Sequence, residues 1–276
     1  MSLRINQNID ALNAYRNLSV TQGQMSKSLE KLSSGFRINR AADDAAGLAV
    51  SEGMRSQIRG MNVAARNAQD GVSMVQVADG ALGNVGDMLQ RVRDLAVQAS
   101  NGTLTDAQRK NLDTEVQQIL TEIGKTGTDT EFNGLKILAG SVATAASAVT
   151  LQVGANASQN IAFTIGTVST SDLGISGIAV STAASATAAI ASLDAAISTV
   201  TTSRANLGAI QNRLEHTINR LGMTSENLQA AESRIRDADM ASEMIDFTKN
   251  QILQQSGMAM LAQANQAPQS VLSLLR

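Results

Sequence analysis

The residues of this chain that could carry out acid–base or metal chemistry are few and scattered. His216 is the only histidine and there is no cysteine, so the residue types of a typical zinc site or thiol nucleophile are missing. Asp43 and Asp44 adjoin Arg37 and Arg40, a pattern that favours local ion pairing and helix capping over a general acid and base. We therefore expect no catalytic residue, no metal site and no cofactor, and His216 is interpreted as an ordinary surface histidine.

Three glycines offer a second candidate for chemistry, because glycine-rich loops bind phosphate groups. Gly80, Gly83 and Gly86 lie inside a helical pattern, whereas a phosphate-binding loop follows a strand and begins a helix. We interpret them as positions where two helices approach closely.

The composition excludes several classes of partner. Lys and Arg total 22 and Asp and Glu total 24, so no charge excess attracts nucleic acid or an anionic membrane. Aromatic residues make up 2% of the chain, too few for an aromatic-lined pocket. No uninterrupted apolar run reaches the ~18 residues of a membrane span, and the first residues lack the pattern of a cleaved signal peptide. We expect neither nucleic acid nor membrane as a partner.

The strongest pattern is a heptad repeat near the C-terminal end. Its members are Leu193, Val200, Leu207, Leu214, Leu221, Leu228 and Ile235. Apolar residues at this spacing predict a long helix packed against other helices. At about 1.5 Å per residue, a helix from Ile190 to Ile235 is on the order of 70 Å long, and it needs partners along its length.

Four further segments share helical spacing. The patterns predict a first helix that ends near Ser33–Gly35, a second from Ala45 to Ser100, a third from the capping-box pair Thr105 and Gln108 to Gly124–Gly127, and a last one after Ala230. In the first and last helices we expect an inner packing stripe of Tyr15, Leu18, Met25, Leu29, Leu32, Met244, Phe247, Met258 and Leu261.

The period falls to two between Asn133 and about Val180, which predicts one or two β-hairpins. The fold class is therefore mainly α: a long antiparallel helical rod or coiled coil with a small β-hairpin region in mid-chain.

The segment from Leu89 to Gln98 differs from a plain core helix. Its inner stripe of Leu89, Val92 and Ala96 rotates other residues outward. We expect Arg91, Leu95 and Gln98 on that outer face, which is either a contact surface or a solvated face with one stray leucine.

Several segments resemble bacterial flagellin. They include LEKLSSGFRINRAADDAAGLAVSE (29–52), LQRVRDLAVQ (89–98), LGAIQNRLEHTINRL (207–221) and MLAQANQAPQSVLSLLR (260–276). The resemblance covers about four-fifths of the chain. It implies a structural protein rather than an enzyme, with residues 1–40 and 234–276 in an inner coiled-coil layer and 41–233 in an outer helical bundle. The interval 177–190 is too short for an extra outer domain, so the resemblance implies a minimal flagellin.

The resemblance also implies a function. Flagellins are exported unfolded without a cleaved leader and polymerise at the filament tip into an extracellular helical tube that propels swimming. A flagellin-like hook-filament junction protein, which shares the termini, is the alternative.

Contacts with partners follow from the same resemblance. Arg91 and Leu95 match the motif by which many flagellins contact the adjacent protofilament and a flagellin-sensing Toll-like receptor. Gln90, Asp94 and Gln98 belong to that motif, and Glu115 is the accompanying acidic contact. Asp94 stands where Glu is commoner. The end, Leu274, Leu275 and Arg276, lies in the region bound by the export chaperone. The filament cap and hook-junction proteins are the remaining implied partners.

Overall fold

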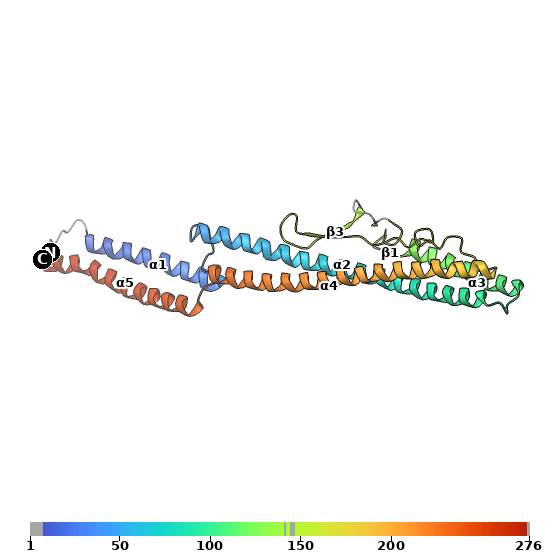
Figure 1. Ribbon diagram of the computed structural model, residues 1–276. Helices are drawn as coiled ribbons and strands as arrows, with labels where there is room; N and C mark the ends of the chain where they lie inside the picture. The colour runs from blue at the N-terminus through green and yellow to red at the C-terminus, as the bar shows by residue number, and fades with distance from the viewer. Residues whose placement is uncertain (1–7, 141, 144–146, 275–276) are drawn as a thin grey trace. The chain divides into compact units, whose positions relative to one another are not determined.

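The structure is a computed structural model that describes residues 8–140, 142–143 and 147–274. Its elements, drawn in Figure 1, are α1 (Ile9–Ser34), α2 (Ala45–Ser100), α3 (Asp106–Asp129), β1 (Glu131–Phe132), β2 (Leu135–Lys136), β3 (Val149–Gln152), β4 (Asn160–Phe163), α4 (Ala183–Arg236) and α5 (Met240–Leu274). Two compact units result: a terminal unit of 1–56 with 227–276, and a central unit of 57–226. The division at 40 and 234 refers to an assembled filament and stays a prediction.

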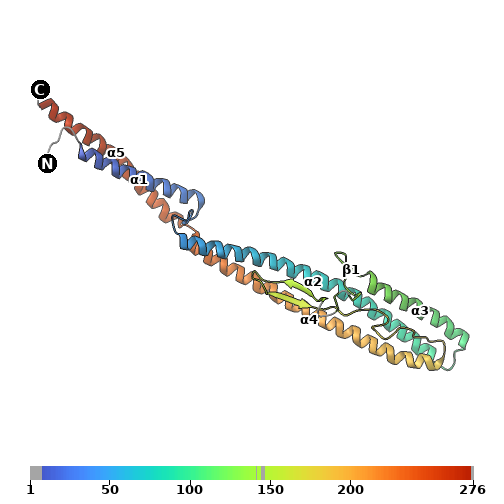
Figure 2. The ribbon, with the colours of Figure 1, turned by 90° about the horizontal axis from the view of Figure 1, so that it is seen from above.

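In the central unit, α2 and α4 run antiparallel and side by side (Figures 1 and 2). The heptad repeat is confirmed there, because Leu193, Val200, Leu207, Leu214 and Leu221 are all buried. The first four of these pack in one core with the predicted inner face of α2, including Val85, Leu89 and Val92. Two ion pairs cross between the helices, from Arg93 Nε to Asp194 Oδ1 at 2.7 Å and from Arg204 Nε to Asp79 Oδ1 at 2.9 Å.

The third helix, α3, begins as predicted and ends later than predicted. The Thr105 side chain accepts from the Gln108 backbone N–H and the Gln108 side chain accepts from the Thr105 backbone N–H. The helix continues through Gly124 and Gly127 to Asp129, so the prediction that these glycines stop it is wrong. Gly127 is buried, and a Cβ placed on it would collide with the Val168 carbonyl oxygen. The segment around Val168 packs so closely against α3 that position 127 has no room for a side chain.

Two β-hairpins confirm the period-two prediction. In the first, Glu131 pairs with Lys136, and Asn133 and Gly134 form the turn with φ of 52° and 75°. In the second, Val149 pairs with Phe163. The chain from 164 to 182 adds buried residues but no strand among the described residues. Polar groups of α3 hold it, since Asp113 Oδ1 accepts from the Val180 N–H at 2.7 Å and Gln117 Nε2 donates to the Ile178 carbonyl at 2.7 Å.

The interpretation of Gly80, Gly83 and Gly86 as close-approach sites is wrong. A Cβ on Gly80 or Gly86 would meet open space, and one on Gly83 would only reach the end of the Arg204 side chain. Close approach occurs at Gly60, where a Cβ would lie 2.9 Å from that of Ala155, and at Gly71, where it would collide with the Leu151 side chain. Apolar periodicity predicts that α2 is a helix, but it does not predict where the β3–β4 hairpin packs against it.

Among the described helices, α4 is the one long and apolar enough to cross a membrane by length and composition alone. Core helices of packed bundles pass the same test, and Leu193 and Val200 of α4 lie in the core of the central unit.

Candidate functional site

The terminal unit is built on an antiparallel pair of α1 and α5. Contacts near both ends fix the direction: Asn8 Nδ2 donates to the Ala264 carbonyl at 2.7 Å, and Lys31 Nζ lies 3.4 Å from Glu243 Oε2. The residues least exposed on the two facing sides define the α1–α5 seam: Ala11, Ala14, Leu18, Thr21, Met25, Ser28 and Leu32 with Glu243, Phe247, Asn250, Gln254, Gly257, Leu261 and Ala264. This spacing of alternating three and four residues is that of coiled-coil a and d positions.

The predicted inner stripe is half right. Leu18, Met25, Leu32, Phe247 and Leu261 lie in the seam and are half-buried. Tyr15, Leu29, Met244 and Met258 do not, since 63%, 48%, 50% and 56% of their surfaces are exposed. These four do not pack between α1 and α5 of one chain, because they occupy e positions, one residue beyond d. Their packing in the inner core of an assembly stays a prediction. The smaller Ala14 and Ser28 face α5 instead.

The four residues at e positions lie on the same side of the α1–α5 pair. In an antiparallel pair the e positions of both helices flank the same edge of the seam, so Tyr15 and Leu29 of α1 lie along the edge that carries Met244 and Met258 of α5. We name these four residues the e stripe. It is an apolar strip that the other described residues leave about half exposed.

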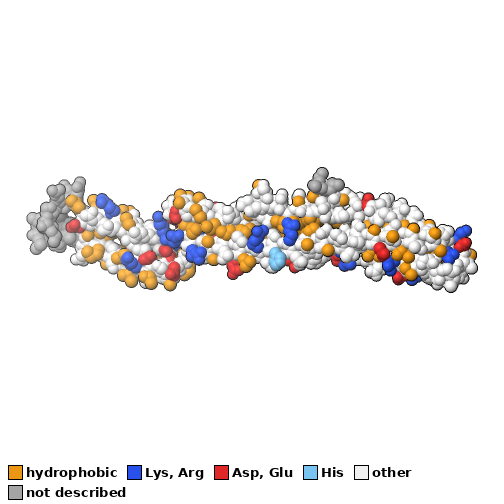
Figure 3. All heavy atoms as spheres, in the orientation of Figure 1, with side chains coloured by type: hydrophobic (Ala, Val, Ile, Leu, Met, Phe, Trp, Pro, Cys, Tyr) orange, Lys and Arg blue, Asp and Glu red, His pale blue; other side chains and the backbone are white. Residues whose placement is uncertain are grey.

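Most large hydrophobic residues exposed among the described side chains belong to the terminal unit. They are Ile9, Leu12, Tyr15, Val20, Leu29, Phe36, Val50, Met240, Met244, Ile245, Ile252, Leu253, Met258 and Met260. The central unit contributes only Val63, Val77, Val97, Leu135 and Met223. Figure 3 shows hydrophobic side chains over the surface of the terminal helices. Soluble monomers seldom leave so much apolar surface uncovered unless it serves for binding.

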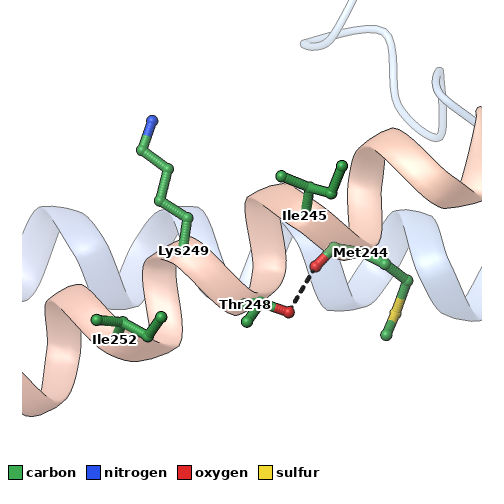
Figure 4. Close-up of a pocket in the computed structure, with 5 residues that line it drawn as sticks. All are labelled: Met244, Ile245, Thr248, Lys249 and Ile252. Atoms are coloured by element: carbon green, nitrogen blue, oxygen red, sulfur yellow. Dashed lines mark hydrogen bonds between the residues drawn. The ribbon is translucent and has the colours of Figure 1, made fainter.

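One part of this surface forms an open groove on α5, lined by Met244, Ile245, Thr248, Lys249 and Ile252 (Figure 4). Ile245 and Lys249 extend to one side of the helix and Met244 to the other. The Thr248 hydroxyl donates to the Met244 carbonyl at 2.8 Å. Lys249 is the charged residue among those that line the groove.

In the terminal unit, the α1–α2 connection and the α4–α5 connection contact each other. Gly35, at φ 75°, ends α1, and the Ala238 N–H donates to its carbonyl at 2.9 Å. The Arg236 guanidinium lies 4.8 Å from the centroid of the Phe36 ring and donates to Glu52 Oε1 at 2.7 Å. Hydrogen bonds from Arg236 and Arg55 lower the pKa of the Glu52 carboxyl. Sequence reasoning missed this cluster, because its members are distant in the chain.

Of the two aspartates near Arg40, Asp44 caps the next helix as predicted, and Asp43 holds the preceding turn. The expected ion pairing with Arg40 is wrong, because the Arg40 guanidinium lies 2.8 Å from Glu30 Oε1 instead. Asp43 Oδ2 accepts from the Arg40 N–H at 3.0 Å and the Asn39 N–H at 3.2 Å, and these bonds, the one from Arg40 most, lower the pKa of Asp43. Asp44 Oδ1 accepts from the Gly47 N–H at 2.9 Å in the first turn of α2. His216 is exposed. Within the described part of the chain, no group of three or more His, Cys, Asp or Glu side chains could hold a metal ion.

The predicted contact motif on α2 is assembled, with one correction. Arg91 donates to Glu115 Oε1 of α3 from Nε at 3.0 Å and from Nη2 at 2.7 Å. Gln90, Asp94 and Gln98 are exposed. Leu95 is only 2% exposed and belongs to the core of the central unit, so its expected place on the outer face is wrong. Helix α3 packs on this side of α2 and covers it.

Of the predicted C-terminal residues, Leu274 is the last residue of α5. Leu275 and Arg276 lie outside the described residues.

Comparison with known proteins gives a consistent result. Residues 5–143 match the family model of the bacterial flagellin N-terminal helical region, and residues 190–275 match that of the C-terminal helical region. The chain is 51% identical over 274 residues to a flagellin of Halalkalibacterium halodurans, with 99% of each covered. It is 49% identical over 284 residues to a flagellar filament 33 kDa core protein of Treponema phagedenis, with 99% of each covered.

A solved structure from Vibrio parahaemolyticus, described as that of a flagellar hook-associated protein, superposes with a TM-score of 0.59 at 14% identity. It covers 71% of this chain and 100% of its own. At that identity the likeness is one of fold alone.

Proposed function

Because this chain belongs to the bacterial flagellin family, it is a structural subunit of the flagellar filament, and we propose that copies assemble through the exposed apolar surface of α1 and α5. The filament that flagellins form lies outside the cell, and its helical assembly serves motility. The single observation that carries the proposal is the concentration of exposed large hydrophobic residues on the terminal helices.

The occupant of this surface is a second copy of the chain. Each large apolar side chain contributes roughly 1.5 to 3 kcal/mol when removed from water, and the terminal unit presents many of them on several sides of two helices. From Phe247 to the last described side chain, Lys249 is the only charged residue of α5. A partner that is itself apolar and poor in charge matches this face, and the same helices of a neighbouring copy meet that requirement.

The α1–α5 seam supports the same assignment, because it is too weak to make the pair self-sufficient. Buried Ser28 and Asn250 and half-buried Thr21 and Gln254 occupy positions where coiled coils place leucine or isoleucine. Residues 1–40 and 234–276 would form the inner layer of the filament, where neighbours cover the outside of the pair.

A second contact surface is proposed on the central unit. Gln90, Arg91, Asp94 and Gln98 are exposed on α2, and Glu115 fixes the Arg91 guanidinium in one orientation. This surface would contact the adjacent protofilament and would be the part read by a flagellin-sensing Toll-like receptor. Buried Leu95 contributes by holding α2 and α3 together beneath it.

The remaining partners are proposed from family membership. The export chaperone would bind the region that includes Leu274, Leu275 and Arg276 before assembly. The filament cap and hook-junction proteins would contact the chain at the two ends of the polymer.

Paired variants test the assembly surface. Ile245→Gln with Ile252→Gln places polar groups in the α5 groove, and Val63→Gln with Val77→Gln changes two exposed apolar positions of the central unit as a control. We expect the α5 variant to lose seeded elongation, measured by light scattering and negative-stain microscopy, and to keep the thermal transition of the unmodified chain. The control should elongate normally.

Elongation of the α5 variant at the unmodified rate would overturn the assembly surface. The unmodified chain should form long tubes on filament seeds, whereas closed short rings would indicate a junction protein instead.

A further inference from the structure

The described methionine side chains are exposed on α5, whereas two methionines of α2 are buried. Four methionines of α5, Met240, Met244, Met258 and Met260, expose 47%, 50%, 56% and 64% of their surfaces. Met61 and Met74 of α2 expose 7% and 4%. Because the chain has no cysteine, thioethers are its side chains most open to two-electron oxidation. Exposure alone therefore separates a reactive group on α5 from a protected group on α2.

We propose that the α5 methionines are an oxidative modification site that takes a peroxide as its reactant, and that their oxidation prevents a subunit from joining the filament. A sulfur lone pair attacks one oxygen of hydrogen peroxide, so that an S–O bond forms and the O–O bond breaks. The sulfur loses two electrons and becomes the sulfoxide. The departing hydroxide takes the hydroxyl proton of the transferred oxygen and leaves as water.

The effect of oxidation depends on where each methionine lies on α5. Met240 and Met258 are about five helical turns apart at 3.6 residues per turn and so share one side of α5, with Met244 close to it. Met244 and Met258 belong to the e stripe, beside Tyr15 and Leu29. Met260 lies on the other side of α5, so both flanks of the seam carry a reactive thioether. Oxidation changes a flexible apolar side chain into a polar one that needs a hydrogen-bond partner when buried.

The inference rests on the proposed assembly surface, because only burial of α5 against another copy makes a sulfoxide there costly. In the unassembled chain the same sulfoxides remain in water. The modification would therefore act on assembly and leave the fold of the central unit intact, and burial in the filament would shield subunits already incorporated.

A partition experiment tests the proposal with the full, unmodified chain. Monomer is treated with hydrogen peroxide until each exposed methionine is oxidised in part of the molecules, quenched, and added to filament seeds. Sedimented filament and supernatant are then digested, and the sulfoxide fraction at each methionine is measured by mass spectrometry. Met223, 61% exposed on α4, is the internal control.

We expect oxidation of the α5 methionines to be roughly tenfold faster than that of Met61 and Met74. Their sulfoxides should be enriched about tenfold in the supernatant, whereas Met223 sulfoxide should partition evenly. Equal partition of α5 and Met223 sulfoxides would overturn the proposal. Whether untreated monomer elongates the seeds at all tests the assembly surface separately.

Substitution gives a second readout. Leucine matches methionine in volume, so M240L/M244L/M258L/M260L should elongate seeds after peroxide treatment, and Met223→Leu should remain as sensitive as the unmodified chain. Enzymatic reduction of the sulfoxides by a methionine sulfoxide reductase should restore elongation of the oxidised unmodified chain. If the fourfold variant lost elongation on oxidation as completely as the unmodified chain, the modification site would lie elsewhere.

Discussion

Leu95 and Arg91 are four residues apart on α2 and have opposite roles in the structure. Leu95 is 2% exposed in the core, and Arg91 is exposed in an ion pair with Glu115. The sequence pattern, with one inner stripe, predicts both residues on the outer face, because it assumes that α2 packs against one helix only. The helix has a second partner there, α3, whose Val116 and Leu120 share the core with Leu95.

We therefore expect Leu95→Ala to destabilise the monomer by about 2–5 kcal/mol, the usual cost of removing a buried leucine. Arg91→Ala should cost less than about 1 kcal/mol, because it breaks an exposed ion pair, and should impair lateral contacts in the filament. Urea unfolding followed by circular dichroism gives the first quantity and sedimentation of seeded filaments the second. Equal stability losses in the two variants would contradict the buried position of Leu95.

The Glu52 carboxylate links pH to the stability of the terminal unit. Arg236 and Arg55 lower its pKa in the folded chain. A lowered pKa stabilises the folded state above the carboxyl's ordinary pKa of about 4.3, and this contribution is lost as the pH falls through the folded value. Glu52→Gln should be less stable than the unmodified chain at pH 7, and the difference should shrink in acid. Exposed Glu226→Gln is the control. A difference constant from pH 7 into the acid range would refute this role.

At the scale of helices, α1 and α5 show that residue spacing alone is compatible with two different packing faces. Positions a and d, and positions a and e, both alternate steps of three and four residues. The a and e alternative collects the larger apolar residues, Tyr15 and Leu29, whereas the actual seam uses Ala14 and Ser28. Hydrophobicity selects the wrong alternative here, because the large residues lie on the side available to other copies.

The glycines of α2 and α3 give a prediction at the same scale. Alanine is favoured over glycine inside a helix by about 1 kcal/mol. Gly80→Ala should stabilise the chain by up to that amount, because its Cβ would meet open space. Gly127→Ala should destabilise it, because the Cβ would collide with the Val168 carbonyl. Thermal melting of the two variants measures both signs, and a gain in stability for Gly127→Ala would show that the 168 segment does not pack against α3 as described.

At the scale of the whole molecule, apolar burial is divided unevenly between the two units. The large connected core lies in the central unit, and most exposed large hydrophobic residues lie in the terminal unit. Few buried apolar contacts mean low local stability. The terminal helices are thus the part of the chain that gains most from neighbouring copies.

Hydrogen exchange measures this difference. In dilute monomer we expect fast amide exchange in α1 and α5 and slow exchange in the core segments of α2 and α4. In filaments, α1 and α5 should become strongly protected, and the central unit should change little. Protection of α1 and α5 in the monomer equal to that of the central unit would contradict the dependence of the terminal helices on assembly.

The sequence by itself determined the long helices, the Thr105 cap and the presence of β-hairpins in mid-chain, because periodicity and turn residues act locally. The bounds of α2, the Thr105 capping box and the Asn133–Gly134 turn all follow from neighbours in the chain. The resemblance of both ends to flagellin likewise needs only the order of residues.

Only the tertiary structure decided which face of each helix is covered, because a second partner can bury what a single stripe leaves outside. Leu95 lies under α3, Tyr15 and Met258 lie outside the α1–α5 seam, and Gly127 lies against Val168. The Arg236, Phe36 and Glu52 cluster likewise joins residues distant in the chain. Burial depends on the packing of distant segments, and that packing leaves the apolar sides of α1 and α5 open to other copies.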